Sequence, residues 1–134
     1  MSFILDASVA AAWVLPDEET SAADIILHRV AAEGAAAPSL LWHELRNILL
    51  MAARRRRLSQ EEVVPSLLRL RRLPIESVDV SASGDAALIR LASAYALSAY
   101  DAAYFALAED RDLPLATADK ALRRACEAHG LALI

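Results

Sequence analysis

Short apolar segments alternate along this chain with longer segments of helical periodicity. Strands are expected at residues 2–5, 35–38, 75–80 and 113–116, with a fifth candidate at residues 131–134. Between them, apolar side chains recur at three- and four-residue steps, which predicts helices over residues 7–15, 20–33, 39–55, 59–73, 83–95, 99–109 and 119–129. This alternation indicates an α/β fold, with a central parallel sheet of four to five strands flanked by helices on both faces.

Glycine and serine residues mark several of the expected helix ends. Gly34 and Gly130 follow the last apolar positions of their helices, where a glycine commonly ends a helix. Ser39 is expected to cap the helix that follows it. Ser59 and Glu62 lie three residues apart, which is the pattern of a capping box.

The length and composition suit one domain over residues 1–134. The chain has 134 residues, of which 57% are hydrophobic, enough for a sizeable core. Its apolar runs are far shorter than the roughly 20 residues of a membrane helix, and its N-terminus lacks the pattern of a signal peptide. The single cysteine, Cys126, cannot build a disulfide framework. We therefore expect a cytoplasmic protein with no membrane partner.

Four acidic residues stand where a charged side chain is unusual. Asp6 and Asp119 come just after predicted strands, and Glu44 and Asp101 lie near the starts of apolar helices. Acidic side chains are rarely buried unless they are paired or bind a cation. Because the carboxyl ends of parallel strands and the starts of the following helices share one edge of the sheet, the four side chains are expected to converge in one crevice.

Carboxylates that share a crevice repel one another, and a divalent cation removes that repulsion. Mg²⁺ or Mn²⁺ suits such a site, because both accept carboxylate and phosphate oxygens as ligands. We expect Asp6, Asp101 and Asp119 to hold the metal directly. Glu44 would bind the metal or position the water that it activates for attack on a phosphodiester.

Two hydroxyl side chains, Ser8 and Thr117, flank these acids in the sequence. They could orient a carboxylate from outside the metal's ligand set. A second interpretation is local capping, by Ser8 or Asp6 for the following turn and by Thr117 or Asp119 for the last helix. The two interpretations are compatible, and the sequence leaves both open.

Basic residues gather in one run near the middle of the chain. The formal net charge of −4 does not point to nucleic acid, but all basic residues except Lys120 are arginine, and residues 54–57 are four arginines in succession. Arginine binds phosphate through a planar fork of donors. Cations at a helix C-terminus also offset the helix dipole. The sequence therefore allows either a weak RNA contact through Arg54, Arg55, Arg56 and Arg57 or a solvated helix end.

Four segments of the chain, each carrying one of the acids, resemble those of the PIN domain and, within it, of the VapC-type toxins of toxin–antitoxin pairs. They are ILDASVAAAWVLPDE, APSLLWHELRNILL, LSAYDAAYFALAED and LPLATADKAL, and together they span nearly the whole chain. The resemblance implies a small α/β fold around a parallel sheet. It also implies cleavage of RNA that depends on Mg²⁺ or Mn²⁺.

The resemblance assigns roles to individual residues and implies partners. Its acidic quartet matches Asp6, Glu44, Asp101 and Asp119. Ser8 and Thr117 match its hydroxyl positions, and Asn47 matches a polar residue one helical turn after the glutamate. A homodimer and a VapB-like antitoxin, which often places an arginine among the acids, are also implied.

The sequence therefore predicts a metal-dependent endoribonuclease, the toxin of a toxin–antitoxin pair. Two other interpretations stay open. The chain could be a PIN-fold binding or regulatory module with weak catalysis, whose acids dock a basic segment, or a PIN nuclease without an antitoxin. Near Asp101, the aromatic residues Tyr100, Tyr104 and Phe105 would pack either in the core or against a second copy of the chain.

Overall fold

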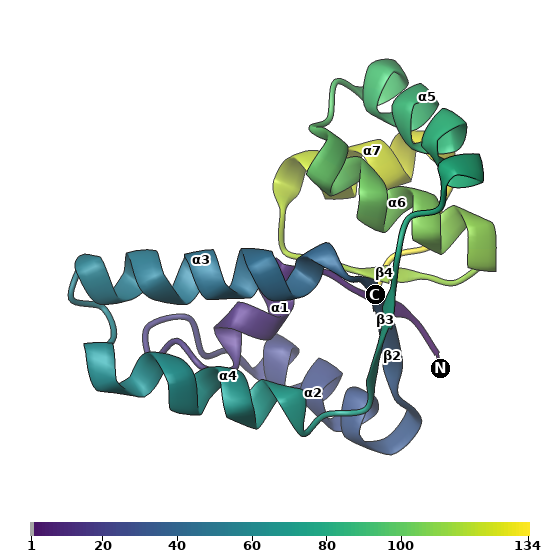
Figure 1. The fold of residues 1–134 in the computed structure, drawn as a ribbon. Coiled ribbons are helices and arrows are strands. Elements are labelled where there is room, and N and C mark those ends of the chain that lie inside the picture. The colour runs from purple at the N-terminus through teal and green to yellow at the C-terminus, as the bar shows by residue number, and fades with distance from the viewer. Residues whose placement is uncertain (1) are drawn as a thin grey trace.

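Four parallel strands form the centre of the molecule, in the order β3-β2-β1-β4 (Figure 1). The computed structural model describes residues 2–134. The strands are β1 (Ile4–Leu5), β2 (Ala35–Pro38), β3 (Ile75–Val78) and β4 (Leu115–Ala116). The helices are α1 (Ala7–Ala12), α2 (Ser21–Glu33), α3 (Leu40–Arg54), α4 (Val63–Arg71), α5 (Asp85–Tyr95), α6 (Ala99–Arg111) and α7 (Lys120–His129), with short 3₁₀ turns η1 (Gln60–Glu62) and η2 (Ala82–Gly84). This arrangement confirms the predicted α/β class.

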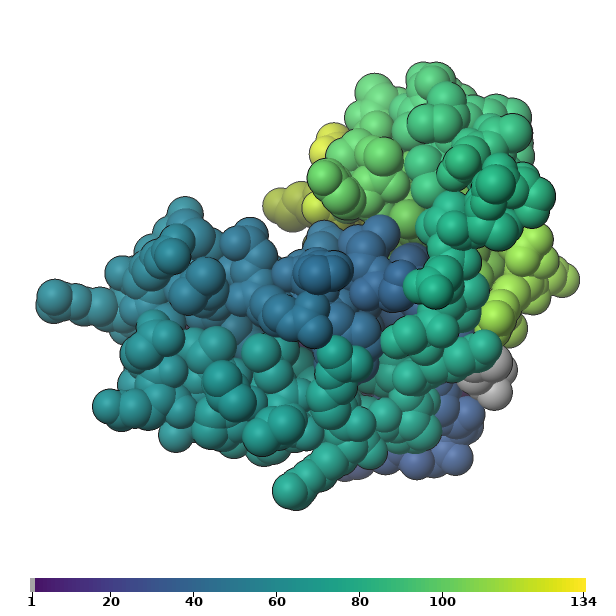
Figure 2. All heavy atoms as spheres, viewed as in Figure 1, coloured from purple at the N-terminus to yellow at the C-terminus, as the bar shows by residue number. Residues whose placement is uncertain are grey.

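The helices form two groups with the strands between them (Figure 1). Helices α1 to α4 gather on one side, and α5 to α7 gather on the other. Helix α6 packs against β1, β2 and β4, whereas α3 packs against β2 and α1. Figure 2 shows the surface hollowed between the α3 body, in blue, and the green to yellow α5–α7 body.

The central strands are buried because both faces of the sheet are covered. Strand β1 pairs with β2 through Ile4 and Ala36, and with β4 through Ile4 and Leu115. These three residues are fully buried. Apolar runs without alternation are what a sheet covered on both faces requires. Because the strands are parallel and in register, their carboxyl ends meet at one edge of the sheet.

The sheet has four strands, of which β2 has the predicted bounds and β1, β3 and β4 are shorter than the sequence indicates. Strand β4 begins after Pro114, which has no N–H to donate to a neighbouring strand. The candidate fifth strand at residues 131–134 is reduced to an isolated bridge between Leu133 and Leu115. β4 offers only two residues for pairing, so a longer ladder cannot form there.

Glycine ends two helices where the sequence predicts it. Gly34 and Gly130 follow α2 and α7 with φ angles of 75° and 86°, a region that favours glycine. The predicted serine caps are wrong. Ser39 already has helical φ and ψ angles, and a capping side chain normally needs an extended backbone. Ser59 precedes the 3₁₀ turn η1 and its side chain makes no capping bond, so no capping box forms.

Three other side chains cap helices by accepting a bond from a backbone N–H. Thr20 accepts from Ala23 at 3.1 Å, and Ser98 accepts from Asp101 at 3.1 Å. Asp119 Oδ1 accepts from Leu122 at 2.8 Å. Ser98 therefore caps the start of α6, which carries Asp101, and Asp119 itself caps α7.

The aromatic residues of α6 divide between core and surface. Tyr104 and Phe105 are fully buried, and Phe105 stacks on Tyr95 with 5.6 Å between ring centroids. Tyr100 is 67% exposed. Core packing therefore accounts for Tyr104 and Phe105 and leaves Tyr100 on the surface. In residues 2–134, no helix combines the length and the apolar character that crossing a membrane requires.

Candidate active site

Asp6 is held at the carboxyl end of β1 by two hydroxyl groups. It is only 5% exposed, and its Oδ2 accepts from Ser8 Oγ at 2.5 Å and from Thr117 Oγ1 at 2.8 Å. Burial raises the pKa of Asp6, and the two hydroxyl bonds oppose that rise. Asp6 precedes α1, but its carboxylate makes no capping bond to that helix. The capping interpretation is therefore wrong for Asp6.

The same hydroxyls tie the segment after β4 to the end of β1. Ser8 Oγ accepts from the Ala118 N–H at 3.0 Å, and Thr117 Oγ1 accepts from the Asp119 N–H at 3.1 Å. The two oxygens lie 3.4 Å apart. Ser8 and Thr117 thus orient Asp6 and fix the backbone that carries Asp119, although the two residues are 109 positions apart in the chain.

Glu44 approaches the site from α3. Its Oε1 accepts a hydrogen bond from the Tyr104 hydroxyl at 2.6 Å. Burial raises the pKa of Glu44, the Tyr104 bond lowers it, and the negative charges of Asp6 and Asp101 raise it further. Glu44 is half-buried. It lies close enough to Asp6 and Asp101 for their negative charges to raise its pKa.

Asp101 lies in the first turn of α6, which Ser98 caps. Its pKa is raised by burial, then by the charges of Asp119 and Asp6. Together with the interactions of Glu44, these repulsions connect all four acids in one electrostatic network. We call Asp6, Glu44, Asp101 and Asp119 the acidic cluster.

Asp119 both caps a helix and faces a cleft. Its Oδ1 caps α7, so the capping interpretation is confirmed for this residue. With Ser8 and Thr117, Asp119 also lines a cleft of about 810 Å³. The rest of the cleft wall comes largely from small and apolar residues of α1, α2 and α3, among them Ala12, Ile26 and Ile48. The cleft therefore extends from Asp119 across the α1–α3 side of the molecule, and the other three acids are not part of its lining.

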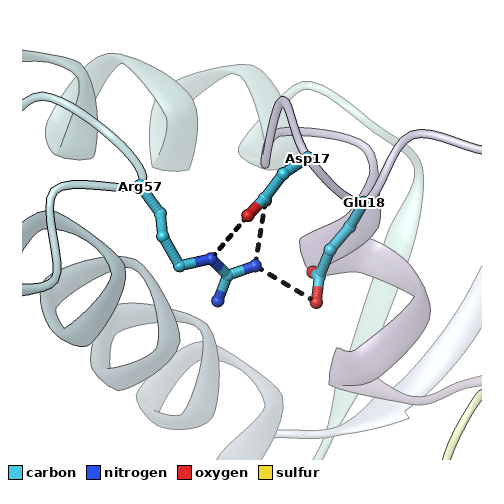
Figure 3. Close-up of polar contacts among 3 residues, drawn as sticks. All are labelled: Asp17, Glu18 and Arg57. Atoms are coloured by element: carbon cyan, nitrogen blue, oxygen red, sulfur yellow. Dashed lines mark hydrogen bonds and ion pairs between the residues drawn. The ribbon is translucent and has the colours of Figure 1, made fainter.

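The other predicted residues lie away from these contacts. Asn47 is exposed on α3, one turn beyond Glu44. In the arginine run, Arg54, Arg55 and Arg56 are exposed. Arg57 donates to Asp17 at 2.7 and 2.9 Å and pairs with Glu18 at 3.4 Å (Figure 3).

We call Arg57, Asp17 and Glu18 the arginine clamp. It joins the chain just after α3 to the loop between α1 and α2 (Figure 3). The bond from Arg57 lowers the pKa of Asp17. Since its guanidinium already binds two carboxylates, Arg57 is less suited to an RNA contact than its three neighbours.

The donor set of the acidic cluster fits a hard divalent cation. Carboxylate oxygens are the ligands that Mg²⁺ and Mn²⁺ prefer, and mutual repulsion among the acids is what such an ion would relieve. As the side chains stand, no three His, Cys, Asp or Glu residues within 2–134 are grouped tightly enough to hold an ion. The acids interact through charge, and holding one ion between them requires their side chains to move closer together.

The hydrogen bond from Tyr104 to Glu44 is a part of this site that the sequence does not predict. Tyr104 follows Asp101 by three residues, which places both on one face of α6. That spacing is the only signal available, and it applies equally to a core residue. Contact with Glu44 depends on how α6 packs against the rest of the fold.

Comparison with known proteins identifies the fold family. The model of the PIN domain family matches residues 3–128. The chain belongs to the PIN domain family. PIN domains are generally nucleases, so membership supports a hydrolase that acts on nucleic acids. A comparison with curated protein sequences gave no match.

Several solved structures share the fold of this PIN domain. PAE2754 from Pyrobaculum aerophilum is 23% identical with a TM-score of 0.73, and the match covers 93% of this chain and 84% of that one. VapBC2 from Rickettsia felis, bound to a DNA fragment from its promoter, is 16% identical with a TM-score of 0.70 and covers 100% and 98%. A toxin–antitoxin complex from Klebsiella pneumoniae is 17% identical with a TM-score of 0.62 and covers 88% and 87%. At these identities, the likeness establishes the fold.

Proposed function

We propose that this PIN domain is a divalent-metal-dependent endoribonuclease and the toxin of a toxin–antitoxin pair. The observation that carries the proposal is the acidic cluster, in which the charges of Asp6 and Asp101 raise the pKa of Glu44, and those of Asp119 and Asp6 raise the pKa of Asp101. A fold rarely retains such repulsion without a functional reason, and perturbed acids in one place are typical of active sites. Membership of a family of nucleases supports the same conclusion.

The four acids would have different roles in metal binding and catalysis. Asp6, Asp101 and Asp119 would hold Mg²⁺ or Mn²⁺, with Glu44 as a fourth ligand or as the group that positions the attacking water. The bound ion would supply activation of that water and stabilisation of the phosphate charge. Ser8 and Thr117 keep the Asp6 carboxylate in one orientation.

Two surfaces suit the proposed partners. Arg54, Arg55 and Arg56 are exposed at the end of α3, where they can contact RNA phosphates, and that contact would weaken as salt rises. The cleft beside Asp119 has mostly apolar walls, which suits a segment of an antitoxin. The fold shared with a toxin–antitoxin complex supports such a partner. A homodimer, the role of Asn47 and a cytoplasmic location remain predictions.

Cleavage of RNA by the purified protein tests the proposal. Wild-type protein should cleave RNA with Mg²⁺ or Mn²⁺, lose activity in EDTA, and recover it when the metal is added back. Asp6→Asn should be inactive while remaining folded by circular dichroism. Asp85→Asn removes an exposed carboxylate at the start of α5 and serves as the matched control. Cleavage that persists in EDTA, or full activity of Asp6→Asn, would overturn the mechanism.

The second candidate is a PIN-fold module that binds a basic segment without useful catalysis. One observation favours it: within residues 2–134, no three candidate metal ligands are grouped for an ion. Such a module would bind a basic peptide through the acidic cluster and show no metal-dependent turnover of RNA. A nuclease that works without an antitoxin would instead lack a neighbouring gene for a DNA-binding protein with a basic tail.

A further inference from the structure

Tyr104 connects the buried face of α6 to the acidic cluster. Its ring is fully buried, and its hydroxyl donates to Glu44 Oε1 at 2.6 Å. Among residues 2–134, this is the only hydrogen bond that the Glu44 carboxylate makes. One side chain therefore decides which way this carboxylate points.

The hydroxyl of Tyr104 meets polar groups rather than the core, since it bonds Glu44 and also interacts with the Ala7 backbone at the start of α1. Its neighbour Phe105 is equally buried and contributes to the core through its ring alone. A buried hydroxyl is costly unless it is bonded, so its position suits its acceptor rather than the core. Burial and the charge of Glu44 both raise the pKa of Tyr104, which keeps the phenol protonated and donating at neutral pH.

We propose that Tyr104 is a positioning residue that limits the orientations of the Glu44 carboxylate beside the other acids, so that Glu44 can bind or serve a divalent metal there, an inference that rests on the proposed function. A glutamate side chain has three rotatable bonds, and a bond to its charged group restricts them. The Tyr104 hydroxyl bonds Oε1, and within residues 2–134 Oε2 makes no hydrogen bond and stays available to a ligand. Tyr104 would touch neither RNA nor metal.

Removal of one hydroxyl group should weaken metal binding without disturbing the RNA interaction. Substitutions of residues that orient metal ligands typically reduce metal affinity about 10- to 100-fold. Tyr104→Phe keeps the buried ring and removes only the hydroxyl. We expect about a 10-fold weaker affinity for Mn²⁺ and a similar rise in the Mn²⁺ concentration for half-maximal cleavage. The KM for RNA should stay within about twofold, because Tyr104 does not contact the substrate.

Tyr95→Phe is the matched control. Tyr95 shares a hydrogen bond with His129 at 2.8 Å, so the variant loses a tyrosine hydroxyl outside the acidic cluster. Mn²⁺ binding is measured by calorimetry without RNA, on wild-type, Tyr104→Phe and Tyr95→Phe proteins whose folding is checked by thermal melting. Only Tyr104→Phe should bind Mn²⁺ more weakly. Equal Mn²⁺ affinity in the three proteins would overturn the proposal.

A double-mutant cycle separates positioning from a general loss of packing. Glu44→Gln removes the charge that Tyr104 orients, so adding Tyr104→Phe to Glu44→Gln should change Mn²⁺ affinity less than twofold. If the two substitutions instead weaken Mn²⁺ binding independently, Tyr104 does not act through Glu44 and the proposal fails.

The metal measurement also separates this inference from the proposed function. A wild-type protein that binds Mn²⁺ but does not cleave RNA would refute the nuclease proposal, and a weakened Tyr104→Phe would still support the positioning role. Metal-dependent cleavage with unaltered Mn²⁺ affinity in Tyr104→Phe would refute the positioning role alone. A wild-type protein that binds no Mn²⁺ would overturn both.

Discussion

The acidic cluster and the arginine clamp shift the pKa of carboxyl side chains in opposite directions. At the clamp, Asp17 faces a guanidinium that lowers its pKa. In the cluster, Asp6, Glu44 and Asp101 have raised pKa values because they are buried and, for Glu44 and Asp101, because they face other acids. The clamp contains its own counter-charge, whereas no cation within residues 2–134 lowers the pKa of Asp6, Glu44 or Asp101.

This difference separates a structural use of charge from a functional one. The clamp fastens a surface loop to the end of α3, and exposed ion pairs of this kind contribute little to stability. The cluster costs stability at neutral pH, since its charges are partly withdrawn from water and repel one another. Proteins commonly keep such destabilising groups where an active site needs strained or unpaired side chains.

The largest effect is expected for a single acid of the cluster. Asp101→Asn should reduce RNA cleavage by about 100-fold or more, because a proposed ligand of the metal loses its charge. Initial cleavage rates under saturating metal measure this effect, with Asp85→Asn as the control. If Asp101→Asn and Asp85→Asn cleave equally fast, the cluster is no more functional than an exposed acid.

A smaller effect is expected for a group that orients Asp6. Thr117→Val keeps the branched shape but removes one of the two hydroxyl bonds to Asp6 Oδ2 and the acceptor of the Asp119 N–H. Cleavage should fall about 10-fold, the lower end of the range for groups that orient metal ligands. Exposed Thr20, which caps α2, provides the control Thr20→Ser, which keeps the capping hydroxyl. An unchanged rate in Thr117→Val would show that Ser8 alone is sufficient.

The pH dependence of stability should differ in sign between the acidic cluster and the arginine clamp. The pKa of Asp6 is raised in the folded state above its ordinary value of 3.8, so the folded protein binds more protons than the unfolded chain. Its favourable contribution is therefore present below that ordinary value and is lost as pH rises through the raised pKa. In metal-free buffer, Asp6→Asn should match wild-type stability near about pH 4 and exceed it by about 1 kcal/mol near about pH 7.

Urea unfolding of both proteins at the two pH values measures that difference. Asp17→Asn should behave in the opposite sense. The folded pKa of Asp17 is lowered, so its contribution is present above the ordinary value and disappears as pH falls through the lowered pKa. If Asp6→Asn is less stable than the wild type at neutral pH, the cluster does not cost stability.

The smallest effect is expected at the clamp. Arg57→Gln should leave cleavage within about twofold of the wild type and lower stability slightly, with the loss shrinking as salt rises. Arg54→Gln removes an arginine that bonds only Met51 Sδ among the described residues and controls for the change in net charge. A drop in cleavage for Arg57→Gln as large as that for Thr117→Val would mean that the clamp serves the site.

The fold class could be predicted because local and global signals agree in this chain. Each central strand is a short apolar run, and Gly34 and Gly130 end helices through a backbone conformation that other residues rarely adopt. The start of α3 could be predicted to within one residue, but the absence of serine capping bonds before α3 and η1 could not be predicted. A serine before a helix caps only when its backbone is extended and a free N–H lies within reach, and tertiary packing decides both.

The site is predictable in part for similar reasons. The four acids stand out by their apolar surroundings in sequence. Thr117 could be proposed from its neighbours, but its bond to Asp6 depends on β1 lying next to β4. Tyr104 and Glu44 are 60 residues apart, and Arg57 and Asp17 are 40 apart. Pairings at such distances follow from the packing of helices and loops, which periodicity does not encode.

The central claim is that the acidic cluster binds a divalent metal. Anomalous scattering from crystals of the wild-type protein grown with Mn²⁺ tests it most directly. We expect a peak among the carboxylates of Asp6, Glu44, Asp101 and Asp119, and its loss in Asp6→Asn crystals. A map without a peak at the cluster, or with Mn²⁺ bound only elsewhere, would contradict it.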